Sequence, residues 1–143
     1  MNGIRAVFVD SGAYLALADR SDRNHERAVT CSRELGSGVL RMTSWGVVSE
    51  TYTWLRYHAS ASAATAWLAG LERACHVGQT EIVLPDARLD GVCRRKLLKF
   101  ADQDLSYVDG MTLAILETLP GIDAVFGFDH HLGLVGLPVL PLS

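Results

Sequence analysis

Cysteine is scarce in this chain, and the few thiols present are not arranged for a disulfide framework or a zinc knuckle. The three residues, Cys31, Cys75 and Cys93, lie far apart and form no Cys-x-x-Cys pair. An odd, scattered set of this kind is typical of reduced thiols that are mostly buried.

Long apolar runs are also missing. No stretch has the length that a membrane span needs, and the first residues lead into the apolar segment 7–9 without the pattern of a signal peptide. We therefore expect a cytoplasmic protein that uses no membrane. With 143 residues, 49% of them hydrophobic, and no repeat or low-complexity linker, the sequence predicts one domain over residues 1–143.

Positive charge is not in excess. The chain has 13 Lys and Arg against 16 Asp and Glu, which gives a net charge of −3. This balance argues against a protein that holds nucleic acid through a wholly basic surface. It does not argue against a site where acidic residues bind divalent cations, since two such ions would reverse the local sign of the charge.

Strand and helix patterns alternate along the chain. Apolar runs typical of buried strands predict strands over residues 4–9, 39–42, 81–84, 124–128 and 139–142. Helical periodicity and capping residues predict helices over residues 13–18, 25–35, 45–58, 61–76, 86–100 and 106–119. The alternation predicts an α/β three-layer sandwich, in which helices flank both faces of a parallel sheet of about five strands.

Four acidic residues occupy positions that such a fold can bring together: Asp10, Glu50, Asp109 and Asp129. Asp10 and Asp129 follow predicted strands, and the carboxyl ends of parallel strands are where ligands bind in open α/β sheets. Asp109 stands at a helix start. Glu50 lies inside a helix beside apolar neighbours, with no Lys or Arg three or four residues away, so we expect it to be shielded from solvent and to need a partner.

Each of these acids except Glu50 also has a purely structural explanation. Asp10 and Asp129 can accept hydrogen bonds from the first turn of a following helix. Asp109 is the third residue after Ser106, which is a variant of the capping box. As a set, however, four crowded carboxylates would repel one another, and oxygen-seeking ions such as Mg²⁺ or Mn²⁺ would offset that repulsion.

Several segments resemble the PIN-domain nucleases, and most closely the VapC-like toxins of bacterial toxin-antitoxin pairs. The similar segments run in order over nearly the whole chain: residues 7–17 (VFVDSGAYLAL), 25–29 (HERAV), 49–51 (SET), 104–109 (DLSYVD) and 128–132 (FDHHL). The resemblance implies a PIN-like fold and an endoribonuclease that depends on Mg²⁺ or Mn²⁺. It also implies an RNA substrate, a homodimer and a small cognate antitoxin that blocks the acidic pocket.

The resemblance further implies a role for individual residues. The acids matching Asp10, Glu50, Asp109 and Asp129 form the family's metal site, Asp10 and Asp109 being the usual direct ligands. The matched polar residues, which would support that site, are Ser11, Asp104 and Ser106.

Two positions depart from the family pattern. Gly127 stands where the family commonly has Thr or Ser, and Leu132 stands where the closing motif has an aromatic residue.

Basic residues and the histidine pair give weaker signals. Arg20, Arg23, Arg94, Arg95 and Lys96 are candidate RNA contacts, although a solvated helix face is the simpler explanation for the run 94–96 with Lys99. His130 and His131 invite a zinc interpretation, but adjacent histidines on a turn rarely both reach one ion.

Three other classes of protein are less consistent with the sequence. A phosphoaspartyl phosphatase would need a second acid two residues after Asp10, where Gly12 stands. A dinucleotide-binding protein would need a Gly-x-Gly-x-x-Gly turn, which the segment 11–14 does not supply. A non-catalytic RNA- or protein-binding module of the same fold remains the alternative from another class, and loss of the acids would indicate it.

Overall fold

A computed structural model describes residues 3–142 of the chain. Five strands form one sheet: β1 (Ala6–Val9), β2 (Leu40–Ser44), β3 (Thr80–Val83), β4 (Ala124–Phe126) and β5 (Val139–Leu140). Their order is β3-β2-β1-β4-β5, and every neighbouring pair is parallel. The predicted five-stranded parallel α/β architecture is confirmed.

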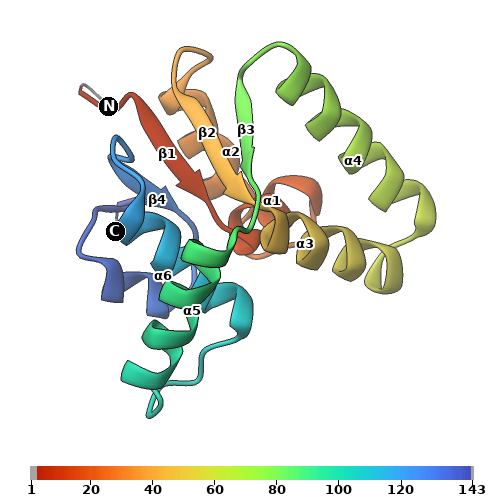
Figure 1. Cartoon of the computed structure of the whole chain (residues 1–143). Coiled ribbons are helices and arrows are strands. Elements are labelled where there is room, and N and C mark those ends of the chain that lie inside the picture. The colour runs from red at the N-terminus through yellow and green to blue at the C-terminus, as the bar shows by residue number, and fades with distance from the viewer. Residues whose placement is uncertain (1–2, 143) are drawn as a thin grey trace.

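Within residues 3–142, seven helical elements accompany the sheet. They are α1 (Ser11–Ala18), α2 (His25–Leu35), α3 (Trp45–His58), α4 (Ala61–His76), α5 (Ala87–Lys99), α6 (Tyr107–Thr118) and the 3₁₀ helix η1 (His130–Val135). Figure 1 shows α5 and α6 packed against each other, and α3 paired with α4 on the β3 side of the sheet. The predicted boundaries differ by up to two residues: β1 begins at Ala6 instead of residue 4, β2 ends at Ser44 instead of 42, β4 ends at Phe126 instead of 128, and β5 ends at Leu140 instead of 142.

The central strand β1 is buried on both faces, which is why its sequence is uniformly apolar. Val7 and Val9 pack in one core cluster with residues of α1 and α2. Phe8 points to the other face and packs in a second cluster with Val47 of α3 and Ile115 of α6. Helices therefore cover both faces of the sheet, as the three-layer prediction requires.

The strand order reverses between β1 and β4: strands β2 and β3 continue on one side of β1, and β4 and β5 on the other. Strands β1 and β4 lie side by side although more than 100 residues separate them. Val9 pairs with Phe126, and the Asp10 backbone N–H donates to the Phe126 carbonyl at 2.9 Å. The carboxyl ends of these two strands thus meet at the position where α/β sheets bind ligands.

The cysteines and the helix lengths agree with the sequence-based expectations. All three cysteines are free, with Cys31 and Cys93 buried, and burial raises the pKa of the Cys31 thiol to about 11. Across residues 3–142, none of the helices combines the length and the hydropathy of a bilayer-crossing segment.

Candidate active site

Asp10 is the buried member of the acidic set. It follows the last residue of β1 and is 4% exposed. Burial, together with the negative charges of Asp109, Glu50 and Asp129, raises its pKa from 3.8 to about 7. A contact with the Ser11 backbone N–H lowers the pKa but is outweighed. The fold therefore brings three acids that are distant in sequence within electrostatic reach of Asp10.

Helix capping, the structural explanation that the sequence offered for Asp10, is not supported by the structure. Asp10 occupies the N-cap position of α1, yet its side chain makes no capping hydrogen bond with the geometry that such a bond requires. A buried carboxyl without a firm partner is unfavourable when ionised. Helix capping therefore does not account for an acid at this position.

The four acids do not form a ready-made cluster of ligand atoms in this structure. Among residues 3–142, no three of these carboxylates have ligand oxygens that all lie within 4.8 Å of each other. Glu50 and Asp129 are exposed and Asp109 is half-buried, so Asp10 is the only one of the four that is buried. The donor set consists of carboxylate oxygens, which are the ligands that Mg²⁺ and Mn²⁺ prefer.

Glu50 differs from the expectation in its environment. It is exposed on α3, whereas we expected it to be shielded from solvent. Its partner is Ser11, whose Oγ donates to Glu50 Oε1 at 2.7 Å. Of the same-face neighbours that suggested burial, Val47 is packed in the core, whereas Thr53 and Trp54 line an open groove between α3 and α6.

Asp109 is held by a capping box at the start of α6. Its Oδ2 accepts from the Ser106 backbone N–H at 2.9 Å, and its own N–H donates to Ser106 Oγ at 3.1 Å. The structural explanation from the Ser-x-x-Asp pattern is therefore confirmed here. It fixes the carboxylate beside Asp10 and so is compatible with a ligand role.

Asp129 caps η1 and meets the histidine pair. Its Oδ1 accepts from the His131 backbone N–H at 2.9 Å, and the His131 Nδ1 lies 2.9 Å from the same oxygen. His130 Nδ1 lies 3.7 Å away. Contrary to the expectation for adjacent histidines, one potential ligand atom from each of the three residues lies within 4.8 Å of the others.

His131, which the sequence suggested only as half of a possible zinc pair, lies close to two of the acids. It is largely buried and lines a small cavity with Asp109 and Leu132, so it lies between two of the acids. The sequence feature that could have pointed to this position is the Asp-x-His spacing of Asp129 and His131. That spacing resembles the closing motif of the family, but we assigned no role in the acidic site to the histidine. Its position next to Asp129 orients that carboxylate.

The departure at Gly127 has a local cause. A Cβ atom added to this residue would lie 2.5 Å from Leu132 Cδ1 and 3.2 Å from Asp10 Cβ. Leu132 thus occupies the space that a side chain at position 127 would need. The absence of a side chain at Gly127 and the presence of leucine at position 132 are therefore linked, because the leucine fills the space that the glycine leaves.

The other predicted residues fall into two groups. Ser11 and Ser106 contact the acids directly, as described above, while Asp104 lies exposed in the loop before α6 and is not among the charges that act on Asp10. Arg20, Arg23 and Arg95 are exposed.

Two of the basic residues on α5 pair with acids of the same chain. Lys96 Nζ lies 2.9 Å from Glu117 Oε1, and Arg94 pairs with Asp90. These pairs agree with the simpler explanation of a solvated helix face.

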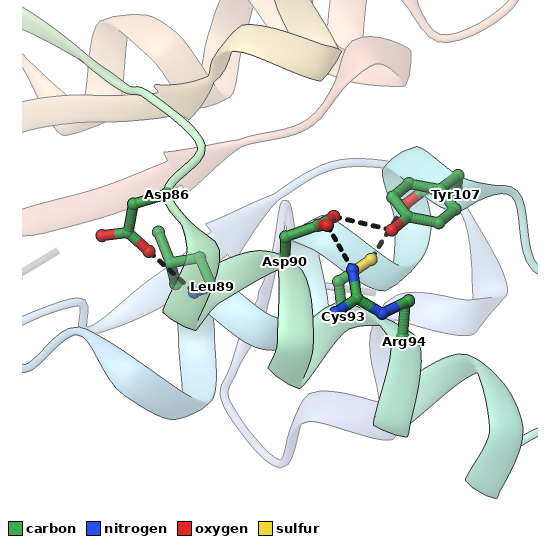
Figure 2. A network of polar contacts seen from close by, with 6 residues as sticks. All are labelled: Asp86, Leu89, Asp90, Cys93, Arg94 and Tyr107. Atoms are coloured by element: carbon green, nitrogen blue, oxygen red, sulfur yellow. Dashed lines mark hydrogen bonds and ion pairs between the residues drawn. The ribbon is translucent and has the colours of Figure 1, made fainter.

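Arg94 belongs to a polar network that joins α5 to the first turn of α6 (Figure 2). The Tyr107 hydroxyl donates to Asp90 Oδ1 at 2.6 Å, and the Cys93 thiol contacts the Tyr107 carbonyl oxygen at 3.6 Å. Tyr107 lies two residues before Asp109. The network therefore anchors the turn that carries one of the four acids.

Comparison with known proteins supports the fold. The sequence matches no protein-family model and no curated protein. Among solved structures, the chain is similar to Mycobacterium tuberculosis VapC20, a Sarcin-Ricin loop cleaving toxin. The TM-score is 0.78 at 23% identity, covering 92% of this chain and 95% of VapC20. It is also similar to FitAcB from Neisseria gonorrhoeae, with a TM-score of 0.64 at 16% identity, covering 93% of this chain and 95% of that chain. The chain therefore has the PIN-like α/β fold that VapC20 has.

Proposed function

We propose that this protein is a divalent-metal-dependent endoribonuclease that hydrolyses phosphodiester bonds in RNA. One observation carries the proposal: a buried carboxyl, Asp10, lies among three further acids, and its pKa is raised to about 7. A folded protein gains nothing in stability from crowding like charges around a buried acid, so such an arrangement points to a bound cation.

The acids would hold one or two Mg²⁺ or Mn²⁺ ions, with Asp10 and Asp109 as the principal ligands and Glu50 and Asp129 completing the set. When bound, such ions polarise the phosphate, activate water for in-line attack and stabilise the leaving oxygen.

The residues around the acids orient them. Ser11 donates to one oxygen of Glu50, the capping box of Ser106 fixes Asp109, and the His131 backbone fixes Asp129. Preorganised ligands reduce the reorganisation that ion binding requires. In this proposal Glu50 or Asp109 would orient or deprotonate the attacking water, and the support is that both carboxylates act electrostatically on Asp10.

Cleavage of single-stranded RNA tests the proposal. The purified protein should cut RNA with Mn²⁺ or Mg²⁺ and leave it intact with EDTA, and Asp109→Asn should lower the rate at least a hundred-fold. Glu81→Gln, which removes an exposed acid on β3, is the matched control and should cut at the wild-type rate. Equal cleavage by Asp109→Asn would disprove the assignment.

The alternative, a non-catalytic binding module, predicts a different response to metal. Only binding to the folded state raises its stability, so a module without a metal site should show no shift in Tm with Mn²⁺. A metal site predicts a rise of several degrees that Asp10→Asn abolishes.

The biological role that we propose is that of a toxin in a bacterial toxin-antitoxin pair. The support is the resemblance in the sequence and the fold similarity to VapC20, itself a Sarcin-Ricin loop cleaving toxin. In this proposal the protein is a cytoplasmic homodimer, and a small antitoxin covers the acidic pocket. Induced expression should arrest bacterial growth, whereas Asp109→Asn at equal abundance should not.

A further inference from the structure

Asp129, His130 and His131 bring one carboxylate and two imidazoles to a common point next to the other acids. One ligand atom from each residue lies within 4.8 Å of the other two. His131 Nδ1 lies 2.9 Å from Asp129 Oδ1, and His130 Nδ1 lies 3.7 Å from the same oxygen. A tetrahedral ion with bonds of about 2.0–2.1 Å needs ligand atoms about 3.4 Å apart, and the two distances lie on either side of this value.

The imidazole of His131 has a ligand atom that no protein group uses. Its side chain is only 12% exposed, and its buried Nδ1 has no hydrogen-bond partner among residues 3–142. The contact with Asp129 Oδ1 is short enough but lacks the geometry of a hydrogen bond. A buried nitrogen without a partner is unfavourable, and coordination to a metal ion would satisfy it.

The rest of the cluster is also arranged for coordination. The two imidazole rings lie side by side, with centroids 3.9 Å apart and planes inclined by 40°. The His131 backbone N–H donates to Asp129 Oδ1 at 2.9 Å, and hydrogen bonds of this kind hold metal-ligating carboxylates in place. The His130 side chain is 85% exposed, so an ion can enter from solvent and keep a water molecule as its fourth ligand.

The donor atoms select the ion. Imidazole nitrogens suit Zn²⁺ and related transition metals, whereas Mg²⁺ and Mn²⁺ prefer oxygen ligands such as the four carboxylates. We propose that Asp129, His130 and His131 bind one Zn²⁺ ion, at a site distinct from the carboxylate site for Mg²⁺ or Mn²⁺. Because the two sites share Asp129, Zn²⁺ withdraws that ligand from the nuclease centre and inhibits cleavage. The inhibition, unlike the zinc binding, rests on the proposed function.

Calorimetric titration of the metal-free protein with Zn²⁺ tests the site without RNA. His130→Gln changes an exposed side chain, so the fold should be retained. It should weaken binding of the first Zn²⁺ ion about ten-fold or more, since even loss of a residue that only supports a ligand has effects of this size. Its Mn²⁺ affinity should equal that of the wild type. Asp10→Asn should show the reverse, with weaker Mn²⁺ binding and unchanged Zn²⁺ binding.

His58→Gln is the matched control, because it removes an exposed histidine on α3. It should bind both ions like the wild type. Equal Zn²⁺ affinity of the wild type and His130→Gln would overturn the proposal, since Zn²⁺ would then bind elsewhere. Absence of Zn²⁺ binding from the wild type would overturn it too, and would leave the cluster as an ion pair between Asp129 and its neighbouring histidines.

The imidazole signals in NMR spectra identify the ligands directly. One equivalent of Zn²⁺ should shift the ring signals of His130 and His131 and leave those of the remaining histidines of the chain unchanged. Shifts that are confined to other histidines, or that occur in none, would contradict the assignment.

Cleavage of RNA separates the zinc site from the nuclease function. With Mn²⁺ present, Zn²⁺ at a concentration that fills the site should inhibit the wild type, and His130→Gln should resist this inhibition. Equal inhibition of the two proteins would overturn the inhibitory role of the site. If the wild type cuts no RNA, the nuclease function fails, whereas the zinc site is still decided by the titration.

Discussion

At the scale of single residues, Asp10 connects stability with function. It is buried where its ionised form is disfavoured by low solvation and by three neighbouring carboxylates. Without a cation, the ionised side chain destabilises the folded state. In the metal site that we propose, the same charge would serve as a ligand to the cation.

Asp10→Asn should stabilise the metal-free protein at pH 8 while abolishing cleavage. The amide removes the unfavourable charge, and the pKa rise from 3.8 to about 7 sets an upper bound of about 4 kcal/mol on the gain. We expect a gain of about 1–3 kcal/mol in the free energy of unfolding by urea denaturation in EDTA. A loss of stability would show that Asp10 has a favourable partner in the folded protein.

The pH dependence of stability follows from the same residue. Between about pH 4 and pH 7, folded Asp10 keeps a proton that the unfolded chain has released. The folded state therefore binds more protons, and the contribution of Asp10 to stability falls as pH rises through this window. The difference in unfolding free energy between Asp10→Asn and wild type should grow from pH 4 to pH 7 in EDTA and then level off. A difference independent of pH would contradict the raised pKa.

Gly127 and Leu132 should behave as a coupled pair. Gly127→Ser alone should cost about 1–3 kcal/mol, because the new Cβ would meet Leu132 Cδ1 at 2.5 Å. Combined with Leu132→Ala, the same serine should cost less than the sum of the two single changes, by 0.5 kcal/mol or more in a urea double-mutant cycle. Additive costs would mean that Leu132 does not fill this space.

At the scale of elements, α6 matters because its first turn carries Asp109. The Ser106 capping box and the Asp90–Tyr107 contact both hold that turn. Close packing against α5 adds to this, since a Cβ atom at Gly110 would lie 2.7 Å from Leu97 Cγ. The position of Asp109 is thus set by hydrogen bonds and by helix packing together.

Ser106→Ala should weaken Mn²⁺ binding in addition to lowering stability. Loss of the cap costs about 1 kcal/mol, and a less ordered turn should reduce Mn²⁺ affinity by roughly ten-fold, measured by calorimetry. Ser60→Ala is the matched control, since Ser60 caps α4 through the same kind of bond to the Ala63 N–H. It should lose similar stability with Mn²⁺ affinity unchanged. If both changes lowered Mn²⁺ affinity equally, Ser106 would contribute to stability only and would not position Asp109 for the ion.

Elements differ in how far the sequence predicts them. The uniform apolar run of β1 predicts a doubly buried strand, and Ser-x-x-Asp predicts the cap of α6, because both depend on local sequence. The exposure of Glu50 was predicted wrongly, since helical periodicity identifies an apolar face without saying whether that face packs in the core or lines a groove. The position of His131 near Asp109 was not predicted for a similar reason: it depends on how η1 packs on α6.

At the scale of the whole molecule, the strand order creates the site. Pairing of β1 with β4 places Asp10 beside the segment that leads to Asp129, although 119 positions separate the two in sequence. Strand alternation predicts a parallel sheet but not which strands are neighbours. The four acids could be proposed together from the sequence because they match a family pattern, whereas their proximity needed the fold.

The central claim is that the four carboxylates bind divalent cations jointly, and a calorimetric Mn²⁺ titration of the metal-free protein tests it most directly. Wild type should bind one or two ions, and each of Asp10→Asn, Glu50→Gln, Asp109→Asn and Asp129→Asn should weaken binding ten-fold or more. Glu81→Gln should bind like wild type. Mn²⁺ binding that is absent from the wild type, or unchanged in all four variants, would contradict the account.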